Sequence, residues 1–116
     1  MNTYQMRTVV RPWGTFQIIY QTHNYWTKIL TVNPGESLSL QYHEKRFEFW
    51  TPLAEGLTGV INGTTVDLVP GTRYDVPRFV LHRISNHGTV PVSLIEVATG
   101  VPDEKDIVRV NDKYGR

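Results

Sequence analysis

The sequence predicts an all-β protein, built as a barrel or a sandwich of short strands. Short runs rich in β-branched and aromatic residues recur along the 116 residues, and turn-forming pairs such as Asn62-Gly63 and Pro70-Gly71 separate them. No segment has the sustained apolar period of 3.6 residues that marks an amphipathic helix. A chain of this length can enclose one hydrophobic core, so we interpret residues 1–116 as a single domain.

The expected strands follow one another with short turns between them. Residues 1–12 are polar and end in Arg11-Pro12, which indicates a short arm or an edge strand. Pro52 predicts a bulge or a break after the strand that contains Glu48. In the tail, residues 101–116, we expect irregular structure with room for one helical turn. The other strand candidates are 15–22, 25–32, 37–43, 47–50, 56–61, 64–69, 73–76, 79–85 and 90–99.

Composition argues against several classes of function. The net charge of +1 is too small for a nucleic-acid-binding surface, and no cluster of basic residues alternates with aromatic ones. The absence of cysteine rules out disulfides and thiolate metal sites. No apolar run approaches membrane-spanning length, and the polar first residues do not form a signal peptide, so we expect a cytoplasmic protein without membrane partners.

The stretch GESLSLQYHEKRFEFW, residues 35–50, carries the strongest chemical signal. Gln41 and His43 share one face of a strand, because successive side chains point to opposite faces. After a charged turn, Glu48 and Trp50 share one face of the next strand. A hairpin here would bring together an amide oxygen, an imidazole and a carboxylate, which are ligands that a borderline divalent metal accepts.

A second stretch, GTRYDVPRFVLHRISN at residues 71–86, contributes another histidine, His82. The two stretches fit the patterns G-x5-(H/Q)-x-H-x4-E and G-x5-P-x4-H-x3-N. Together they resemble the two motifs of the cupin superfamily, whose β-barrel holds a metal on residues from both. The resemblance implies a cupin-type double-stranded β-helix, or jelly-roll barrel. It also implies one divalent metal ion, zinc first and manganese, iron, cobalt or nickel as alternatives, bound by Gln41, His43, Glu48 and His82.

Further segments narrow the resemblance to one family. RPWG at 11–14, PGESLSLQYH at 34–43 and DIVRVNDKYGR at 106–116 are similar to the cupin domain of type II mannose-6-phosphate isomerases. That domain occurs alone or fused behind a mannose-1-phosphate guanylyltransferase domain. The resemblance implies interconversion of mannose 6-phosphate and fructose 6-phosphate, a small-molecule sugar phosphate as the ligand, and a possible homodimer.

The chemistry of such an isomerase assigns roles to several charged residues. A divalent cation would stabilise the negative charge of an enediolate, and arginine suits phosphate because of its bidentate geometry. The cations in positions that resemble the family are Arg11, Lys28, Arg46, Arg83, Arg109 and Arg116. From these we expect Lys28, Arg46, Arg83 and Arg109 to bind substrate. The catalytic candidates are Lys45, Arg46, Arg83 and Glu96. The alternative for Arg109 and Arg116 is a structural role, in which the tail pins the barrel closed.

The chain departs from the family at three histidines. Where the family reads Q-x-H-H-H-R-A-E-H-W, this chain reads Q-Y-H-E-K-R-F-E-F-W, so Glu44, Lys45 and Phe49 replace residues that could relay protons. A lysine with an ordinary pKa of about 10.4 is a poor base at neutral pH, so we expect weak isomerase activity or none, with metal binding intact.

These departures leave three functions open. The first is the sugar-phosphate isomerase, and the second is a non-catalytic metal-binding cupin that binds a sugar or a sugar phosphate. A different metal chemistry, such as oxygenation or epimerisation, has less support from the matching residues. For the four ligand candidates the alternative is a hydrogen-bonded polar interior without a metal.

Overall fold

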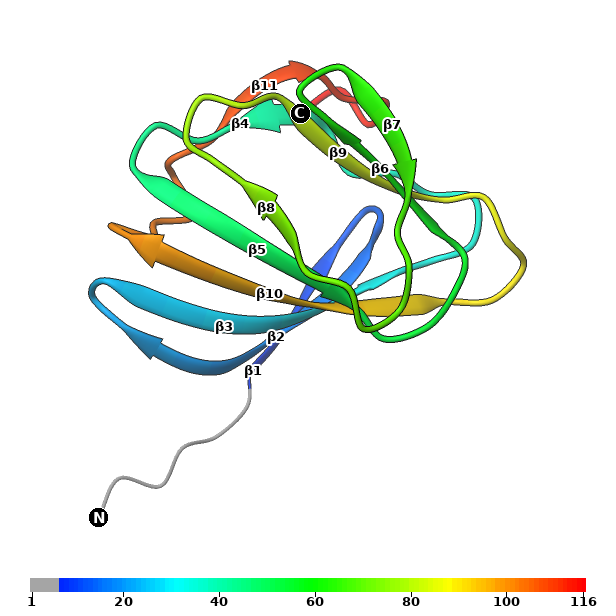
Figure 1. The fold of residues 1–116 in the computed structure, drawn as a ribbon, viewed down its shortest axis with the longest axis horizontal. Helices are drawn as coiled ribbons and strands as arrows, with labels where there is room; N and C mark the ends of the chain where they lie inside the picture. Colours follow the sequence, from blue (N-terminus) through cyan, green and yellow to red (C-terminus); the bar gives the residue numbers. More distant parts are fainter. Residues whose placement is uncertain (1–6) are drawn as a thin grey trace.

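The computed structural model describes residues 7–116, which form strands and turns, and no helix in this part of the chain could cross a membrane. The strands make two antiparallel sheets that face each other (Figure 1). In the order β1-β2-β3-β10-β5-β8, the first sheet contains Arg7–Arg11, Gly14–Thr22, Tyr25–Val32, Val92–Gly100, Arg46–Pro52 and Tyr74–Val76. In the order β11-β4-β9-β6-β7, the second contains Val108–Asn111, Leu40–Tyr42, His82–Asn86, Leu57–Ile61 and Thr64–Asp67. The all-β prediction is confirmed.

Local sequence explains several of these elements. In β3 the side chains alternate strictly between half-buried and buried, as the pattern of residues 25–32 predicts. Asn62 and Gly63 both have positive φ, 52° and 80°, and join the paired residues Ile61 and Thr64. Such a two-residue turn matches the twist of the flanking strands, so the predicted β6–β7 hairpin is confirmed.

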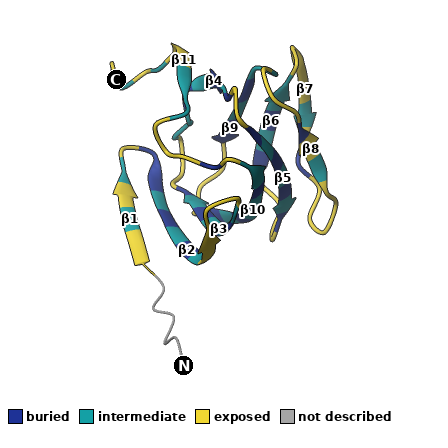
Figure 2. Cartoon of the chain, turned by 90° about the vertical axis from the view of Figure 1, so that its left-hand side faces the viewer, coloured by how far each residue is buried: buried dark blue, intermediate teal, exposed yellow. Residues whose placement is uncertain are grey.

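The interior of the molecule is apolar at one end and polar at the other. Along β3 the inward residues run from Val32 and Leu30 to Lys28, and along β10 they run from Leu94 to Glu96. These strands are adjacent, and their apolar and polar positions lie opposite each other in register. Figure 2 shows buried residues on strands of both sheets, whereas the edge strand β1 is largely exposed. The apolar end therefore supplies the core, and the polar end is available for a site.

Three expectations about the chain path were wrong in whole or in part. The stretch at residues 35–50 is not a hairpin, because β4 and β5 belong to different sheets and the turn at Glu44-Lys45 crosses between them. The bulge that Pro52 predicts is absent, since β5 pairs in regular register with β10 up to Pro52, but the strand does end at this proline. The tail is not irregular throughout, because Val108–Asn111 forms β11 and pairs with β4. Of the expected N-terminal arm, residues 7–11 form the edge strand β1, and the first six residues lie outside the described part.

Candidate metal centre

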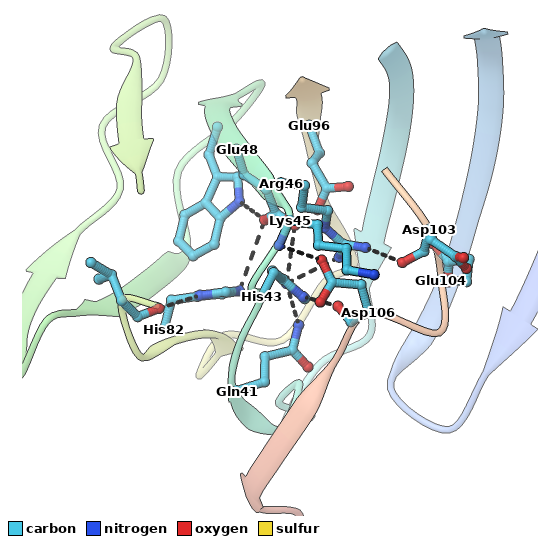
Figure 3. A network of polar contacts seen from close by, with 12 residues as sticks. Gln41, His43, Lys45, Arg46, Glu48, His82, Glu96, Asp103, Glu104 and Asp106 are labelled. Carbon is cyan, nitrogen blue, oxygen red and sulfur yellow. Dashed lines mark hydrogen bonds and ion pairs between the residues drawn. The ribbon is translucent and has the colours of Figure 1, made fainter. Parts of the chain in front are cut away.

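Three predicted ligands meet at the polar end of the interior. His43 follows β4, Glu48 lies on β5 and His82 begins β9, so two sheets contribute (Figure 3). Their candidate ligand atoms all lie within 4.8 Å of one another, and all three residues are buried. The His43 Nε2 atom lies 3.2 Å from Glu48 Oε2, and the His82 Nε2 atom lies 3.9 Å from Glu48 Oε1. Two imidazoles and a carboxylate at this spacing form the donor set of a zinc-type or related transition-metal site.

Hydrogen bonds to backbone carbonyls orient both histidines. The Nδ1 atom of His43 lies 2.6 Å from the Asp106 carbonyl oxygen, and that of His82 lies 3.0 Å from the Val80 carbonyl oxygen. A carbonyl oxygen only accepts, so each Nδ1 carries a proton, and in the neutral imidazole each Nε2 then presents a lone pair toward Glu48. Metal-binding histidines have this arrangement, in which the second nitrogen is fixed by a hydrogen bond.

One atom of this group has no hydrogen-bond partner among residues 7–116. The His82 Nε2 atom is buried and makes no hydrogen bond to any described residue. A buried polar atom without a partner costs about 1–3 kcal/mol, so a group that binds this lone pair would remove the cost. Burial also lowers the pKa of His82, because it penalises the imidazolium more than the nearby Glu48 carboxylate favours it. The donor set and the unpartnered atom both fit a divalent cation.

Gln41, the fourth predicted ligand, lies beside the group but turns its amide oxygen away. Its Oε1 accepts a hydrogen bond from the Ser39 hydroxyl at 2.5 Å, while its Nε2 lies 3.4 Å from His43 Nε2. A hydroxyl can also accept, so rotation of the amide would keep a bond to Ser39 and present the oxygen to the centre. Gln41 thus lies at the site, but its amide nitrogen, and not its oxygen, faces the centre.

Arg46 is the charged partner of the centre. Its Nε donates to Glu48 Oε2 at 2.8 Å, one Nη lies 3.0 Å from His43 Nε2, and the other donates to the Asp103 carbonyl at 2.9 Å. Burial alone would raise the pKa of Glu48, but the Arg46 guanidinium, together with His43 and His82, outweighs it and holds that pKa well below its ordinary value. Glu48 is therefore ionised at neutral pH, as a ligand must be.

A pocket of about 120 Å³ adjoins the centre, and Gln41 and Arg46 belong to both. Its buried carboxyl group is that of Glu96, which accepts a hydrogen bond from the Trp26 indole at 2.9 Å. Burial, assisted by the Glu48 charge, raises the pKa of Glu96 to about 7. The lining residues are Arg11, Trp13, Phe16, Lys28, Leu30, Leu38, Gln41, Arg46, Glu96, Glu104, Ile107, Arg109 and Arg116.

The expected substrate residues divide into two groups. Lys28, Arg46, Glu96 and Arg109 line the pocket. Arg83 does not: it follows His82 on the same strand, points to the opposite face, and donates to Asn111 Oδ1 at 2.9 Å. Lys45 is exposed on the turn before β5 and is not part of the pocket lining. The expectation that Arg83 and Lys45 lie at the substrate site is therefore corrected on geometric grounds.

Sequence reasoning missed the segment that covers the centre. Besides its carbonyl bond to His43, Asp106 accepts the backbone N–H groups of Glu44 and Lys45 at 3.0 and 2.9 Å. Glu104 forms an ion pair with the buried Lys28, whose ammonium lies 3.5 Å from the centre of the Trp26 ring. The acid-rich composition of residues 103–106 was the available signal, but no local pattern shows that they fold back onto β3 and β4.

Residues 1–112 match the family described as mannose-6-phosphate isomerase C-terminal. The chain belongs to this family. It is 40% identical, over 111 residues, to the mannose-1-phosphate guanylyltransferase ManC of Salmonella typhimurium; this match covers 95% of the chain and 23% of the relative. The chain thus spans about a quarter of that relative's length, in accordance with a family defined on a C-terminal region.

Solved structures with low sequence identity share the fold. The capsular polysaccharide assembling protein CapF of Staphylococcus aureus aligns with a TM-score of 0.79 at 16% identity, over 95% of this chain and 34% of that one. The Cnp3 cupin domain of Schizosaccharomyces pombe aligns with a TM-score of 0.69 at 16% identity, over 74% and 64% of the two chains. The predicted cupin double-stranded β-helix is therefore confirmed.

Proposed function

We propose that this domain is a metal-dependent sugar-phosphate isomerase that interconverts mannose 6-phosphate and fructose 6-phosphate. One observation carries the proposal: the His43–Glu48–His82 centre and a cation-lined pocket with a buried carboxyl group meet at Arg46. Family membership supports the choice of reaction, because the family takes its description from mannose-6-phosphate isomerase.

The site residues match the needs of an aldose–ketose isomerisation. When bound by His43, Glu48, His82 and a rotated Gln41, a divalent cation would supply positive charge next to the sugar oxygens. Glu96 would move the proton between the neighbouring carbons, because a carboxyl group with a pKa near 7 can both accept and return a proton at neutral pH. Arg46 stays charged, since Glu48 and Glu96 raise its pKa although burial opposes this, and it would attract an anionic substrate.

A second candidate, a non-catalytic cupin that binds a sugar or a sugar phosphate, has one observation in its favour. The Nη of Arg46 lies 3.0 Å from His43 Nε2, so a guanidinium partly satisfies a lone pair that a metal would use. A polar interior in which Arg46 satisfies His43 in place of a metal could remain folded after catalysis is lost. This candidate predicts ligand binding without turnover.

The test is a coupled assay for fructose 6-phosphate, carried out on protein loaded in turn with each of the five metals. The isomerase proposal expects turnover of mannose 6-phosphate that Glu96→Gln lowers by about a hundredfold or more, as removal of a general base does. Glu55→Gln, at an exposed loop residue, is the matched control and should keep wild-type turnover. Saturable binding of mannose 6-phosphate without product from any metal-loaded form would favour the binding protein instead.

A further inference from the structure

We propose that the outer side of the first sheet is a docking surface for a second copy of this chain, so that the domain forms a dimer with two-fold symmetry. The surface centres on five half-buried apolar side chains, which we call the outer patch: Ile29, Phe47, Phe49, Ile95 and Val97. The inference does not rest on the proposed function, because the metal centre and the pocket lie on the inner side of the sheets.

The outer patch is continuous across the neighbouring strands β3, β10 and β5 (Figure 1). Val97 pairs in register with Phe49, and Ile95 pairs in register with Ile29. The centroids of the Phe47 and Phe49 rings lie 5.0 Å apart. Residues directly opposite each other on adjacent strands have their side chains on the same face and close enough to touch, so the five side chains form one surface.

No strand of residues 7–116 covers this patch. These residues form two sheets and no helix, and the second sheet packs on the inner side of the first. An antiparallel sheet with one face in water normally has its polar side chains on that face. In β5 the order is reversed, because the charged Arg46 and Glu48 point inward while Phe47 and Phe49 point outward. Contiguous apolar side chains on an outer face mark an interaction surface.

The residues around the outer patch are uncharged. Although 20% of the chain is charged, the outward positions of β2, β3, β10 and β5 carry only apolar, hydroxyl and amide side chains. Depletion of charge is the compositional signal of an interface core. It also indicates the occupant, because in a contact between two identical faces a charge near the two-fold axis meets its own copy. A surface for a different partner is free to carry charge.

Opposite charges lie side by side at one rim of the patch. Arg73 directly precedes the edge strand β8, and its Nε lies 3.0 Å from Asp75 Oδ1 on that strand. The Arg73 guanidinium lies 4.9 Å from the centre of the Phe49 ring, so the ion pair borders the aromatic pair. An adjacent cation and anion are self-complementary, since two-fold symmetry can set the cation of each copy against the anion of the other.

The aromatic pair distinguishes this chain from its family. Phe47 and Phe49 stand where the family sequence Q-x-H-H-H-R-A-E-H-W has alanine and histidine. Two phenyl rings enlarge the apolar area that would leave water on docking, and aromatic side chains are enriched in interface cores. The docking surface is therefore assigned to this chain and not to the family as a whole.

The size of the surface sets the expected affinity. Four strands about 4.8 Å apart, each about seven residues long at about 3.3 Å per residue, give roughly 450 Å² of projected area per copy. Two copies would cover roughly 900 Å², close to the lower limit of about 1,000 Å² for a biological interface. We therefore expect a reversible dimer with a dissociation constant on the order of 10 µM.

The test is sedimentation velocity of the purified chain from about 1 to 300 µM, a range that spans the expected dissociation constant. The wild-type mass should rise with concentration from 13.3 kDa towards twice that value. Val97→Lys sets like charges against each other across the two-fold axis and should raise the dissociation constant at least about tenfold. Val90→Lys makes the same change at a 60% exposed valine in the turn before β10 and should dimerise as wild type does.

A second variant and a second measurement guard against a folding defect. Phe47→Ala/Phe49→His restores the residues of the family sequence and should raise the dissociation constant about tenfold. In methyl NMR spectra of wild type, the Ile29 and Ile95 signals should shift with concentration, whereas that of Ile84, buried in the core, should not.

Two results would overturn the proposal. A wild type that stays monomeric over the whole concentration range would leave the outer patch to a partner other than a second copy. A dimer that Val97→Lys and the Phe47→Ala/Phe49→His variant leave intact would place the contact elsewhere, with the exposed edge strand β1 as the next segment to test.

Discussion

Replacing His82 with Phe should have little effect on the metal-free protein but remove its stabilisation by metal. In the metal-free protein the change removes the unpartnered Nε2 atom, a gain of about 1–3 kcal/mol, and loses the hydrogen bond to Val80, a cost of about 1 kcal/mol. A phenyl ring can keep the ring contacts to His43 and Trp50, whose centroids lie 4.8 and 5.5 Å away. The variant should therefore be as stable as wild type or more so, by up to about 2 kcal/mol.

When metal is bound, wild type should become more stable than the His82→Phe variant. An ion at about 100 times its dissociation constant adds about 2.7 kcal/mol to the unfolding free energy of wild type, which raises the melting temperature on the order of 10 °C for a chain of this size. His82→Phe removes one of two imidazole ligands, so its melting temperature should not change with metal. His87→Phe makes the same substitution at an exposed turn and should keep the wild-type shift.

The assay is thermal unfolding with a chelator and then with each of zinc, manganese, iron, cobalt and nickel. Binding needs neutral imidazoles, and burial lowers the pKa of His82, so the shift should persist at neutral pH and decrease below about pH 6. An equal metal-induced shift in His82→Phe and wild type would refute the ligand role of His82. A wild-type protein that none of the five ions stabilises would refute the metal centre as a whole.

Two further predictions concern the residues around the centre. Glu96 has a pKa of about 7 in the folded protein and an ordinary value of 4.5, so its contribution to stability is complete below pH 4.5 and is lost as pH rises through 7. Glu96→Gln should abolish this loss, at most about 3 kcal/mol, in urea unfolding curves between pH 5 and 8; an unchanged pH profile would contradict the raised pKa. Asp106→Ala removes the acceptor of two N–H groups and should weaken metal binding several-fold, with Asp106→Asn in between, in competition titrations with a chromogenic chelator. Equal affinities in all three proteins would show that the Asp106 side chain does not position His43.

The sequence predicts what depends on local alternation and misses what depends on long-range pairing. His43, Glu48 and His82 meet as expected, because the alternation of residues along the chain places all three side chains inward, and Gln41 is buried beside them. The short turn at residues 44–46 is compatible both with a hairpin and with a crossing between sheets, so the sheet assignment of β4 and β5 could not be predicted. Arg109 reaches the pocket only because β11 pairs with β4, a contact between segments more than 60 residues apart.

The orientation of Arg83 could have been predicted. A residue that follows an inward-facing strand residue points outward, and Arg83 directly follows His82. A residue that directly follows or precedes a metal ligand on a strand therefore faces away from the ligand's site. The same rule favours a role for Arg46 in the site, because Arg46 is two residues before Glu48 and shares its face of the strand.

The three replaced histidines also have to be judged by their positions in the fold. Glu44 and Lys45 are exposed at the crossing turn, and Phe49 lies between the inward residues Glu48 and Trp50 on the outer face, where its ring is 4.9 Å from the Arg73 guanidinium. None of the three lines the pocket, so their loss removes no interior proton carrier and is no reason to expect weak activity.

Restoring histidine at positions 44 and 45 should therefore change turnover of mannose 6-phosphate by less than about threefold, whereas Glu96→Gln should lower it by about a hundredfold or more. The coupled fructose 6-phosphate assay measures both effects, with the metal content of each variant determined in parallel. A rise of about tenfold or more in the double histidine variant, at unchanged metal content, would place the base on the turn. In that case the raised pKa of Glu96 reflects burial and the Glu48 charge without a catalytic role, and Lys45 regains the catalytic role that its neighbours in the sequence suggest.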